Sequence, residues 1–291
     1  QHRDMVVAAA EQGVKGIYLE KPLCRTLKEA DEMVDACKAR GVKVAVSHQT
    51  RYSPKLPVIE DLLRKGAIGK LLEIRGRGKE DSRGGGEDLW VLGTHVLDMM
   101  HYLGGKPRWC FASVEQNGRP ISKEDVVPGN EGIGLLAGDS VHAMYRLGDG
   151  VTGYFDSTRN ASGRGGNRFG IRLYGTEGIV EMGTGYLGAC LVLRDPLWSS
   201  GRSQKKWIPI SSAGVGVDEP LEDVGLKGGN DLAVRDLIAA IEADRKPKSS
   251  IEDARVATEM IVAVFESQRQ GTPVFFPLKN RENPLSMLAP Q

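Results

Sequence analysis

The sequence has no close pair of cysteines, no surplus of charge and no long apolar run. Its four cysteines are scattered singly, which argues against a zinc site or a disulfide framework and fits a reducing cytoplasm. With 39 lysines and arginines against 38 aspartates and glutamates, it offers no excess positive charge for nucleic acid or an anionic membrane. No stretch is long enough for a membrane-spanning helix. We therefore expect a cytoplasmic protein whose partner is a small neutral or anionic ligand.

Hydrophobic residues make up 40% of the 291 positions, which is enough for a full core, and the length suggests two domains. The first residue, Gln1, is not methionine, and residues 4–11 have the alanine-rich pattern of a helix rather than that of a signal peptide. We therefore expect the chain to begin inside a domain, with an earlier segment of that domain absent.

Residues 4–53 alternate between helix and strand patterns. A helix leads to the apolar run 16–19, a second helix begins after Thr26, which has capping-box spacing to Glu29, and the strand 42–47 follows. Alternation of this kind is typical of a parallel α/β sheet. We expect these residues to form part of such a sheet.

Polar residues follow both of these strands. Glu20-Lys21-Pro22 comes directly after the first strand, and His48-Gln49-Thr50-Arg51 comes after the second. The carboxyl ends of parallel strands meet at one edge of the sheet, and ligands of open α/β sheets bind beyond that edge. The sequence therefore predicts a ligand site beside these two segments.

From Pro54 onward the pattern changes to that of an α+β domain. Helices are predicted at 58–65, from about 93 to 103, at 231–243 and at 251–268, the last capped by Ser250. Strands are predicted at 71–75, 141–147, 151–156, 169–174, 179–182 and 187–194. A loop rich in glycine and charge is expected at 79–88. This pattern predicts an open, mostly antiparallel sheet with helices on one face.

Three glycines, Gly183, Gly185 and Gly188, have the G-x-G-x-x-G spacing of a dinucleotide-binding turn. That turn binds pyrophosphate only when a helix amino terminus follows it. Here the residues that follow, 189–194, have a strand pattern. We therefore interpret this glycine motif as a β-hairpin turn, and we expect any true phosphate-binding turn to precede Gln1.

Five motifs occur in order along nearly the whole chain. They are Glu20-Lys21-Pro22; Arg51-Tyr52-Ser53-Pro54 before a helix that ends in Gly66-Ala67-Ile68-Gly69-Lys70; Gly93-Thr94-His95-Val96-Leu97-Asp98 with Leu103-Gly104-Gly105; Tyr174-Gly175-Thr176-Glu177-Gly178; and the stretch 250–278. Together and in this order, they resemble the glucose-fructose oxidoreductase, inositol dehydrogenase and MocA (Gfo/Idh/MocA) family.

The resemblance implies a Rossmann domain, cut short and covering residues 1–53, followed by a substrate and oligomerisation domain over residues 54–291. It implies hydride transfer between the nicotinamide of NAD or NADP and a hydroxyl-bearing carbon of a sugar, inositol or related polyol. It also implies that subunits pair into a homo-oligomer through the open sheet. No nucleic acid or membrane partner is expected.

In the family pattern Lys21 holds the substrate hydroxyl, while Glu20 and Pro22 shape the nicotinamide side of the site. A cation beside the reacting oxygen stabilises a developing alkoxide, which agrees with a lysine in this place. The Lys-Pro bond is often cis in this family, and X-Pro bonds adopt cis at low cost. His48 and Arg51 are further candidates for binding the cofactor, although Arg51 could instead anchor the junction between the domains.

His95 matches the family's histidine that takes the hydroxyl proton, a role that suits imidazole because its pKa lies near neutrality. Many members carry an aspartate four residues earlier, where this chain has Val91, and Asp88 is our candidate replacement. Trp90 and Asp98 complete the substrate-binding candidates. His95 with Asp98 and His101 could suggest a metal, but no third or fourth ligand stands at a useful spacing, so no metal site is expected.

Three alternatives stay open at this point. His95 could be a core histidine whose ring is satisfied by Asp98 at i+3. The chain could belong to the relatives that act as glycosidases and use a tightly held NAD to oxidise and then restore the sugar. Without its own glycine turn it could also serve as a non-catalytic binding or assembly protein.

Overall fold

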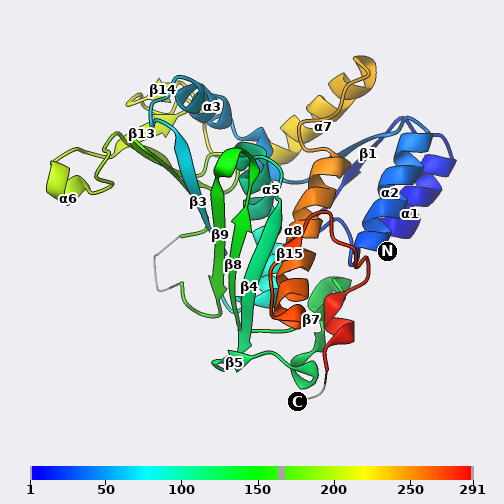
Figure 1. Cartoon of the computed structure of the whole chain (residues 1–291). Coiled ribbons are helices and arrows are strands. Elements are labelled where there is room, and N and C mark those ends of the chain that lie inside the picture. The colour runs from blue at the N-terminus through cyan, green and yellow to red at the C-terminus, as the bar shows by residue number, and fades with distance from the viewer. Residues whose placement is uncertain (1, 163–167, 290–291) are drawn as a thin grey trace.

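The computed structural model describes residues 2–162 and 168–289, so Gln1 lies outside the described part. These residues form a two-stranded parallel sheet, an eleven-stranded mixed sheet and a two-stranded pair, β6 (Val127–Pro128) with β7 (Leu135–Leu136). In Figure 1 the small parallel sheet lies beside two helices at one side of the molecule, and the large sheet forms the other side. The expected fold class, a parallel α/β part followed by an open sheet with helices, is confirmed.

The small sheet and its helices occupy the first part of the chain. The elements are α1 (His2–Glu11), β1 (Gly16–Leu19), α2 (Leu27–Ala39), β2 (Lys43–Val46) and the 3-10 helix η1 (Gln49–Tyr52). β1 and β2 pair in parallel, with Gly16 opposite Lys43 and Leu19 opposite Val46. The segments that follow the two strands therefore begin at the same edge of the sheet.

The expected capping box at the start of α2 is only half formed. The Thr26 hydroxyl accepts the Glu29 N–H at 3.2 Å, as expected of an N-cap. The Glu29 carboxylate, however, accepts the Arg25 N–H at 2.9 Å and also pairs with the Arg25 side chain. The reciprocal bond to Thr26 was therefore a wrong prediction, because the neighbouring arginine competes for the carboxylate.

The large sheet has the strand order β14-β13-β12-β11-β10-β3-β9-β8-β4-β15, with β5 paired to β4. β3 and β9 run parallel, and the other described neighbours are antiparallel. The strands are β3 (Leu71–Arg77), β4 (Trp109–Gln116), β5 (Arg119–Pro120), β8 (Ser140–Arg146), β9 (Thr152–Thr158), β10 (Gly170–Gly175), β11 (Gly178–Gly183), β12 (Cys190–Leu193), β13 (Ile208–Ser211), β14 (Gly214–Val215) and β15 (Val274–Phe275).

Two long helices, α5 and α8, cover one face of this sheet (Figure 1). The helices of this part are α3 (Leu56–Arg64), α4 (Gly86–Val91), α5 (Gly93–Gly104), α6 (Ser200–Ser203), α7 (Leu226–Glu242) and α8 (Ile251–Gln270), with short 3-10 turns η2 (Lys123–Asp125), η3 (Asn130–Gly132), η4 (Gly148–Gly150) and η5 (Pro284–Met287). On β4 the alternating residues Cys110, Ala112 and Val114 are buried, and Phe111 is exposed on the opposite face.

Two glycines allow α5 to lie close against the sheet. A Cβ at Gly76 would come 2.4 Å from Val96 Cγ1, and one at Gly153 would come 2.5 Å from the Met100 sulfur. Larger residues would therefore push the helix away. This contact fixes the position of α5, and the side of α5 that carries Asp98 is left to face the small sheet.

The carboxyl-terminal helices return to the small sheet. A Cβ at Gly16 on β1 would lie 2.6 Å from Ile241 Cδ1 on α7, so the two elements are in close contact. The Val46 N–H donates to the Ser249 carbonyl at 2.9 Å, and Ala45 forms an isolated bridge with Ser250 at the start of α8. Residues far apart in sequence thus buttress the ends of the two parallel strands.

Several elements differ from the sequence-based prediction, among them the short strands β13, β14 and β15, which were not predicted. α4 lies within what was expected to be a loop and its continuation, β4 was not predicted as a strand, and α7 begins five residues before the predicted start at residue 231. The first turn of α7 contains Gly228 and Gly229, and glycine has a low helix propensity, so no helix was predicted there. Packing requires them here, because a Cβ would lie 2.8 Å from the Tyr186 ring and 2.7 Å from Gln49 Cβ respectively.

The glycine motif at residues 183–188 does connect two antiparallel strands. β11 ends at Gly183, β12 begins at Cys190, and the two strands pair with Met182 opposite Cys190. The interpretation as a hairpin turn is therefore confirmed. Among the described residues, no helix combines the length and apolar character needed to cross a lipid bilayer.

Candidate active site

Lys21 stands directly beyond the carboxyl end of β1. Its peptide bond to Pro22 is cis, as the resemblance implied. The Lys21 N–H donates to the Ser47 hydroxyl at 3.1 Å, and that hydroxyl donates to the Glu20 carboxylate at 2.7 Å. The Lys21 ammonium donates to the Val91 carbonyl at 2.8 Å. The side chain therefore reaches from the small sheet to the end of α4, one helical turn before His95.

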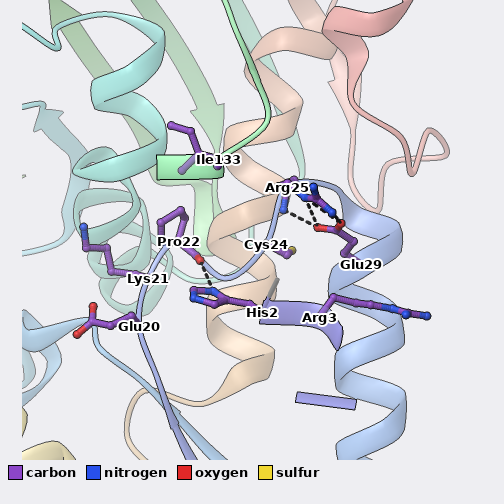
Figure 2. A pocket seen from close by; sticks show the side chains of 10 residues that line it. His2, Arg3, Glu20, Lys21, Pro22, Cys24, Arg25, Glu29 and Ile133 are labelled. Atoms are coloured by element: carbon purple, nitrogen blue, oxygen red, sulfur yellow. Dashed lines mark hydrogen bonds and ion pairs between the residues drawn. The ribbon is translucent and has the colours of Figure 1, made fainter. Parts of the chain in front are cut away.

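A pocket of about 280 Å³ opens beside this strand end (Figure 2). Figure 2 shows the Lys21 and Glu20 side chains on one side of it, away from Arg25 and Glu29 on the other. The lining residues are His2, Arg3, Glu20, Lys21, Pro22, Cys24, Arg25, Glu29, Gly132 and Ile133. His95 is not among these residues, so it stands behind Lys21 rather than in the pocket wall.

His2 ties the amino terminus of α1 to the loop that follows β1. Its Nδ1 lies 3.1 Å from the Pro22 carbonyl and 3.2 Å from the Leu23 carbonyl. A carbonyl oxygen can only accept, so Nδ1 carries the hydrogen. This bond holds the backbone just after Lys21 in place. His2 was not predicted as a site residue, because its separation of twenty residues from Pro22 gives no local signal in the sequence.

His95 lies in the first turn of α5 and is 7% exposed. Its ring meets the His48 ring edge-on, with centroids 5.5 Å apart. Burial, and then the neighbouring His48 and Lys21, hold the pKa of His95 well below its ordinary value. The ring is therefore neutral at physiological pH and able to accept a proton.

His48, at the end of β2, is 1% exposed. Its Nε2 lies 3.0 Å from the Thr94 hydroxyl, and its Nδ1 lies 3.5 Å from both the Ser249 hydroxyl and the Asp98 carboxylate. Burial, together with the charges of Arg51 and Lys21, lowers the pKa of His48 to about 3. His48 therefore has almost no surface with which to touch a cofactor. The geometry favours a role in the interior over the expected direct contact between His48 and the cofactor.

Arg51 joins three elements in the interior. Its Nε lies 3.3 Å from Asp98 on α5, its Nη2 lies 3.1 Å from Asp253 on α8, and its guanidinium stacks 3.8 Å from the centre of the Tyr102 ring. His101 lies 3.5 Å from the same Asp253. With 5% exposure, Arg51 is placed as the anchor of the junction, which was the alternative to cofactor binding.

Asp98 faces this junction and not His95. Its carboxylate approaches Arg51 and His48, and no hydrogen bond joins it to His95 among the described residues. The interpretation of His95 as a core histidine satisfied by Asp98 is therefore wrong. Burial outweighs the nearby Arg51 and raises the pKa of Asp98 to about 6. With 0% exposure, Asp98 has no path to direct substrate contact.

The structure does not bring Asp88 and Trp90 to the surface of the site. Asp88 is fully buried, where its carboxylate accepts from the Ser157 hydroxyl at 2.6 Å and the Glu80 N–H at 3.0 Å. It therefore fixes the 79–86 loop against β9. Trp90 is 1% exposed and belongs to the core. At the position where many family members have aspartate, Val91 offers its backbone carbonyl to Lys21 instead.

Four further residues contact Lys21, His48 or Arg51 and were not predicted as site residues from the sequence. Ser47, Thr94 and Ser249 contribute hydroxyls, and Asp253 pairs with Arg51. A signal for Asp253 was present: Ser250 and Asp253 have capping-box spacing and form that box at the start of α8. Nothing in the local sequence shows that this cap points at an arginine two hundred residues earlier.

Two family models cover most of the chain. The model of the Gfo/Idh/MocA oxidoreductase family, C-terminal alpha/beta domain, matches residues 62–276, and that of the NAD-binding Rossmann fold of the same family matches residues 1–48. Together they follow the division between the small and the large sheet.

Relatives of known activity are similar to this chain. Levoglucosan dehydrogenase of Pseudarthrobacter phenanthrenivorans is 31% identical over 211 residues, which are 62% of this chain and 52% of that protein. The chain thus spans about half the length of this relative. 1,5-Anhydro-D-fructose reductase of Ensifer adhaerens is 28% identical over 283 residues, 93% of this chain and 75% of that protein.

Among solved structures, levoglucosan dehydrogenase in complex with NADH and L-sorbose has a TM-score of 0.73 at 25% identity, over 95% of this chain and 77% of that one. The fold, the order of the motifs and the family models agree from the first strand to the last helix. The chain belongs to the Gfo/Idh/MocA oxidoreductase family.

Proposed function

We propose that this chain carries the substrate-facing part of an NAD(P)-dependent dehydrogenase that acts on a sugar, inositol or related polyol. The observation that carries the proposal is the position of Lys21, whose side chain extends from the end of β1 to the end of α4, one turn before His95. A cation and a neutral imidazole are thereby brought to the same strand end.

Lys21 would hold the hydroxyl oxygen of the substrate. Its ammonium is already directed at a carbonyl oxygen, that of Val91, so the geometry suits an oxygen ligand. A positive charge next to that oxygen stabilises the alkoxide character that develops as the proton leaves. Ser47 and Glu20 hold the Lys21 backbone in this arrangement.

His95 would accept the hydroxyl proton. A base must be unprotonated before the reaction, and burial with the neighbouring Lys21 and His48 keeps His95 neutral by lowering its pKa. The lowered pKa also makes the ring a weaker base than the expected imidazole with a pKa near neutrality, so the proton transfer relies on Lys21 to stabilise the alkoxide. His95 as a whole residue is 7% exposed and lies in the first turn of α5, one turn after Val91, whose carbonyl accepts from Lys21.

The residues at the strand end fit one end of a nicotinamide cofactor. The pocket of about 280 Å³ is near the lower limit of roughly 300 Å³ for ligand pockets, so it suits a ring rather than a whole dinucleotide. We propose that Glu20, Lys21 and Pro22 form its wall towards the nicotinamide of NAD or NADP. When bound, the cofactor supplies the hydride acceptor.

Replacement of Lys21 tests this proposal. In the protein that contains this chain, Lys21→Ala should lower kcat for polyol-dependent nicotinamide reduction by at least roughly a hundredfold, because the charge beside the developing alkoxide is lost. Lys15→Ala is the matched control, since this exposed lysine precedes the same strand at its opposite end. Unchanged turnover in the Lys21 variant would remove the proposed mechanism.

We also propose that two copies of the chain pair through the uncovered face of the large sheet. Along one register row this face presents Phe111, Met144, Tyr154 and Arg75 on four neighbouring strands. Phe111 is 44% exposed, and the Arg75 guanidinium lies 5.6 Å from the Tyr154 ring centre. Such a mixed aromatic and arginine surface is typical of protein interfaces.

A further inference from the structure

We propose that Asp98 is a positioning residue, which acts through His48 and Thr94 to fix the first turn of α5 and so the orientation of His95. This inference rests on the proposed function only for its catalytic consequence. The geometry that carries it is a buried series of contacts from Arg51 to Asp98, from Asp98 to His48 and from His48 to Thr94.

The two ring nitrogens of His48 contact two residues of the same helix, α5. Nδ1 faces Asp98 Oδ1 and the Ser249 hydroxyl, each at 3.5 Å, and Nε2 faces the Thr94 hydroxyl at 3.0 Å. The Ser249 hydroxyl can accept as well as donate, so it is compatible with either tautomer and Asp98 is the group that selects between them. Thr94 and Asp98 are one turn apart on α5, so they lie on the same side of it. Thr94 is adjacent to His95, and any shift of Thr94 moves the His95 backbone with it.

The charge of Asp98 selects the tautomer of His48. The ring is neutral, so only one nitrogen carries hydrogen. At 3.5 Å the Asp98 contact is electrostatic rather than a short hydrogen bond, but a carboxylate favours N–H over a lone pair on the nitrogen that faces it. With hydrogen on Nδ1, Nε2 must accept, and the Thr94 hydroxyl then donates to it.

Arg51 allows Asp98 to keep this charge in the interior. Its guanidinium lies 3.3 Å from one Asp98 oxygen, while Asp253 and the Tyr102 ring hold it from other sides. Arg51 can only donate hydrogen bonds. An asparagine at position 98 would therefore turn its oxygen towards Arg51 and its NH₂ group towards His48 Nδ1, which reverses the preferred tautomer.

This reversal distinguishes positioning from mere structural support. A buried ion pair that only stabilises the fold would change unfolding free energy without changing the tautomer of one particular histidine. Glu259 offers the matched control, because this residue of α8 is 4% exposed and pairs with Arg255 of the same helix and with Arg281. Glu259→Gln removes a buried, arginine-paired carboxylate without touching His48.

The experiment is nitrogen-15 NMR of the histidine rings in the protein, with signals assigned through His48→Gln and His95→Gln. We expect His48 as the Nδ1–H tautomer in the wild type, mainly as Nε2–H in Asp98→Asn, and unchanged in Glu259→Gln. The His95 signals should move in Asp98→Asn alone. If Asp98→Asn does not fold, Thr94→Val should move His95 and leave His48 as Nδ1–H.

Two results would overturn the proposal: a wild-type His48 that is mainly Nε2–H, or Asp98→Asn rings identical to those of the wild type. Where turnover is measured, Asp98→Asn should lower kcat about tenfold or more and leave the KM for the cofactor within twofold. A protein that shows the tautomer change but no polyol-dependent turnover would contradict the proposed function and leave the positioning role of Asp98 standing.

Discussion

The two sheets of the molecule use their residues in different ways. The small parallel sheet has only two described strands, yet Lys21 and His48 follow directly from their ends. The large sheet has eleven strands, and its polar groups lie mainly on its uncovered face, where cross-strand pairs such as His142 with Asp156 satisfy them. The first sheet therefore positions the proposed catalytic lysine at its edge, and the second supports α5.

The helix α5 contacts both the large sheet and the segment that follows β2 of the small sheet. Its Val96 and Met100 side is held against glycines of the large sheet, and its Thr94 and Asp98 side faces His48. The large sheet thereby fixes where His95 stands relative to Lys21. This difference between the two sheets leads to the predictions below. Substitutions where α5 meets the small sheet should change turnover or the stability of the fold. Substitutions on the uncovered face of the large sheet should change only the association of subunits.

The largest expected effect is that of His95→Asn. An amide cannot accept the hydroxyl proton, so kcat for nicotinamide reduction should fall by roughly 10²–10⁴-fold, the usual contribution of a general base. The KM for the cofactor should change little, because His95 is not in the pocket wall. Steady-state kinetics of the variant and the wild type measure both values, and a loss confined to KM would contradict the assigned role.

Next in size is the loss of stability in Arg51→Met. The change keeps an apolar stem over Tyr102 but leaves Asp98 and Asp253 without their shared cation. Removal of one partner of a buried ion pair costs about 3–5 kcal/mol. Urea unfolding at pH 7 measures this loss. Arg64→Met, which removes an exposed arginine from α3, is the control and should lie within about 0.5 kcal/mol of the wild type.

A smaller effect should appear as a difference in pH dependence between Asp98 and Asp253. Burial raises the pKa of Asp98 above its ordinary 3.8 to about 6, so its ionisation costs stability as the pH rises between these values. For Asp253 partial burial opposes the charge, but His101, Arg51 and Ser250 hold its pKa below the ordinary value. Its contribution to stability is therefore present above that value and lost as the pH falls below it.

Unfolding free energies measured from pH 3 to pH 7 check these opposite signs. Relative to the wild type, Asp98→Asn should gain stability as the pH rises from 4 to 7, by at most about 3 kcal/mol. The deficit of Asp253→Asn should shrink as the pH falls below about 4. Curves of both variants that run parallel to that of the wild type would show that neither carboxyl has a displaced pKa in the folded protein.

The sequence predicted the parts of the site that follow from local pattern. Glu20-Lys21-Pro22 and His48 come directly after apolar strands, and their meeting at one edge follows from parallel pairing. Asp88 and Trp90 were misplaced because the residues around them were expected to form a loop and its continuation, whereas α4 forms there and buries both side chains. Asp253 and Ser249 were missed because they reach the site only through the return of the carboxyl-terminal segment.

For the fold, too, the sequence predicted the elements that have a clear local pattern and missed others. Alternating apolar residues identified β8 to β11. β4 was not predicted, although its residues also alternate, and it begins only a short turn after α5. α7 began earlier than predicted because Gly228 and Gly229 are required by contacts with Tyr186 and Gln49, which no local rule reveals. Tertiary packing, and not local preference, decided each of these differences.

The smallest expected effect on the monomer is that of Phe111→Thr on the uncovered face. Threonine suits a strand, and Phe111 is 44% exposed, so the unfolding free energy of the monomer should change by about 0.5 kcal/mol or less. If this face pairs two subunits, the same change removes an aromatic contact and should weaken self-association about tenfold or more in sedimentation velocity. Leu226→Ser is the control, since Leu226 is 68% exposed but lies on α7. A protein whose association is equally weakened by both variants, or that is monomeric throughout, would show that the large sheet supports α5 and does not act as an interface.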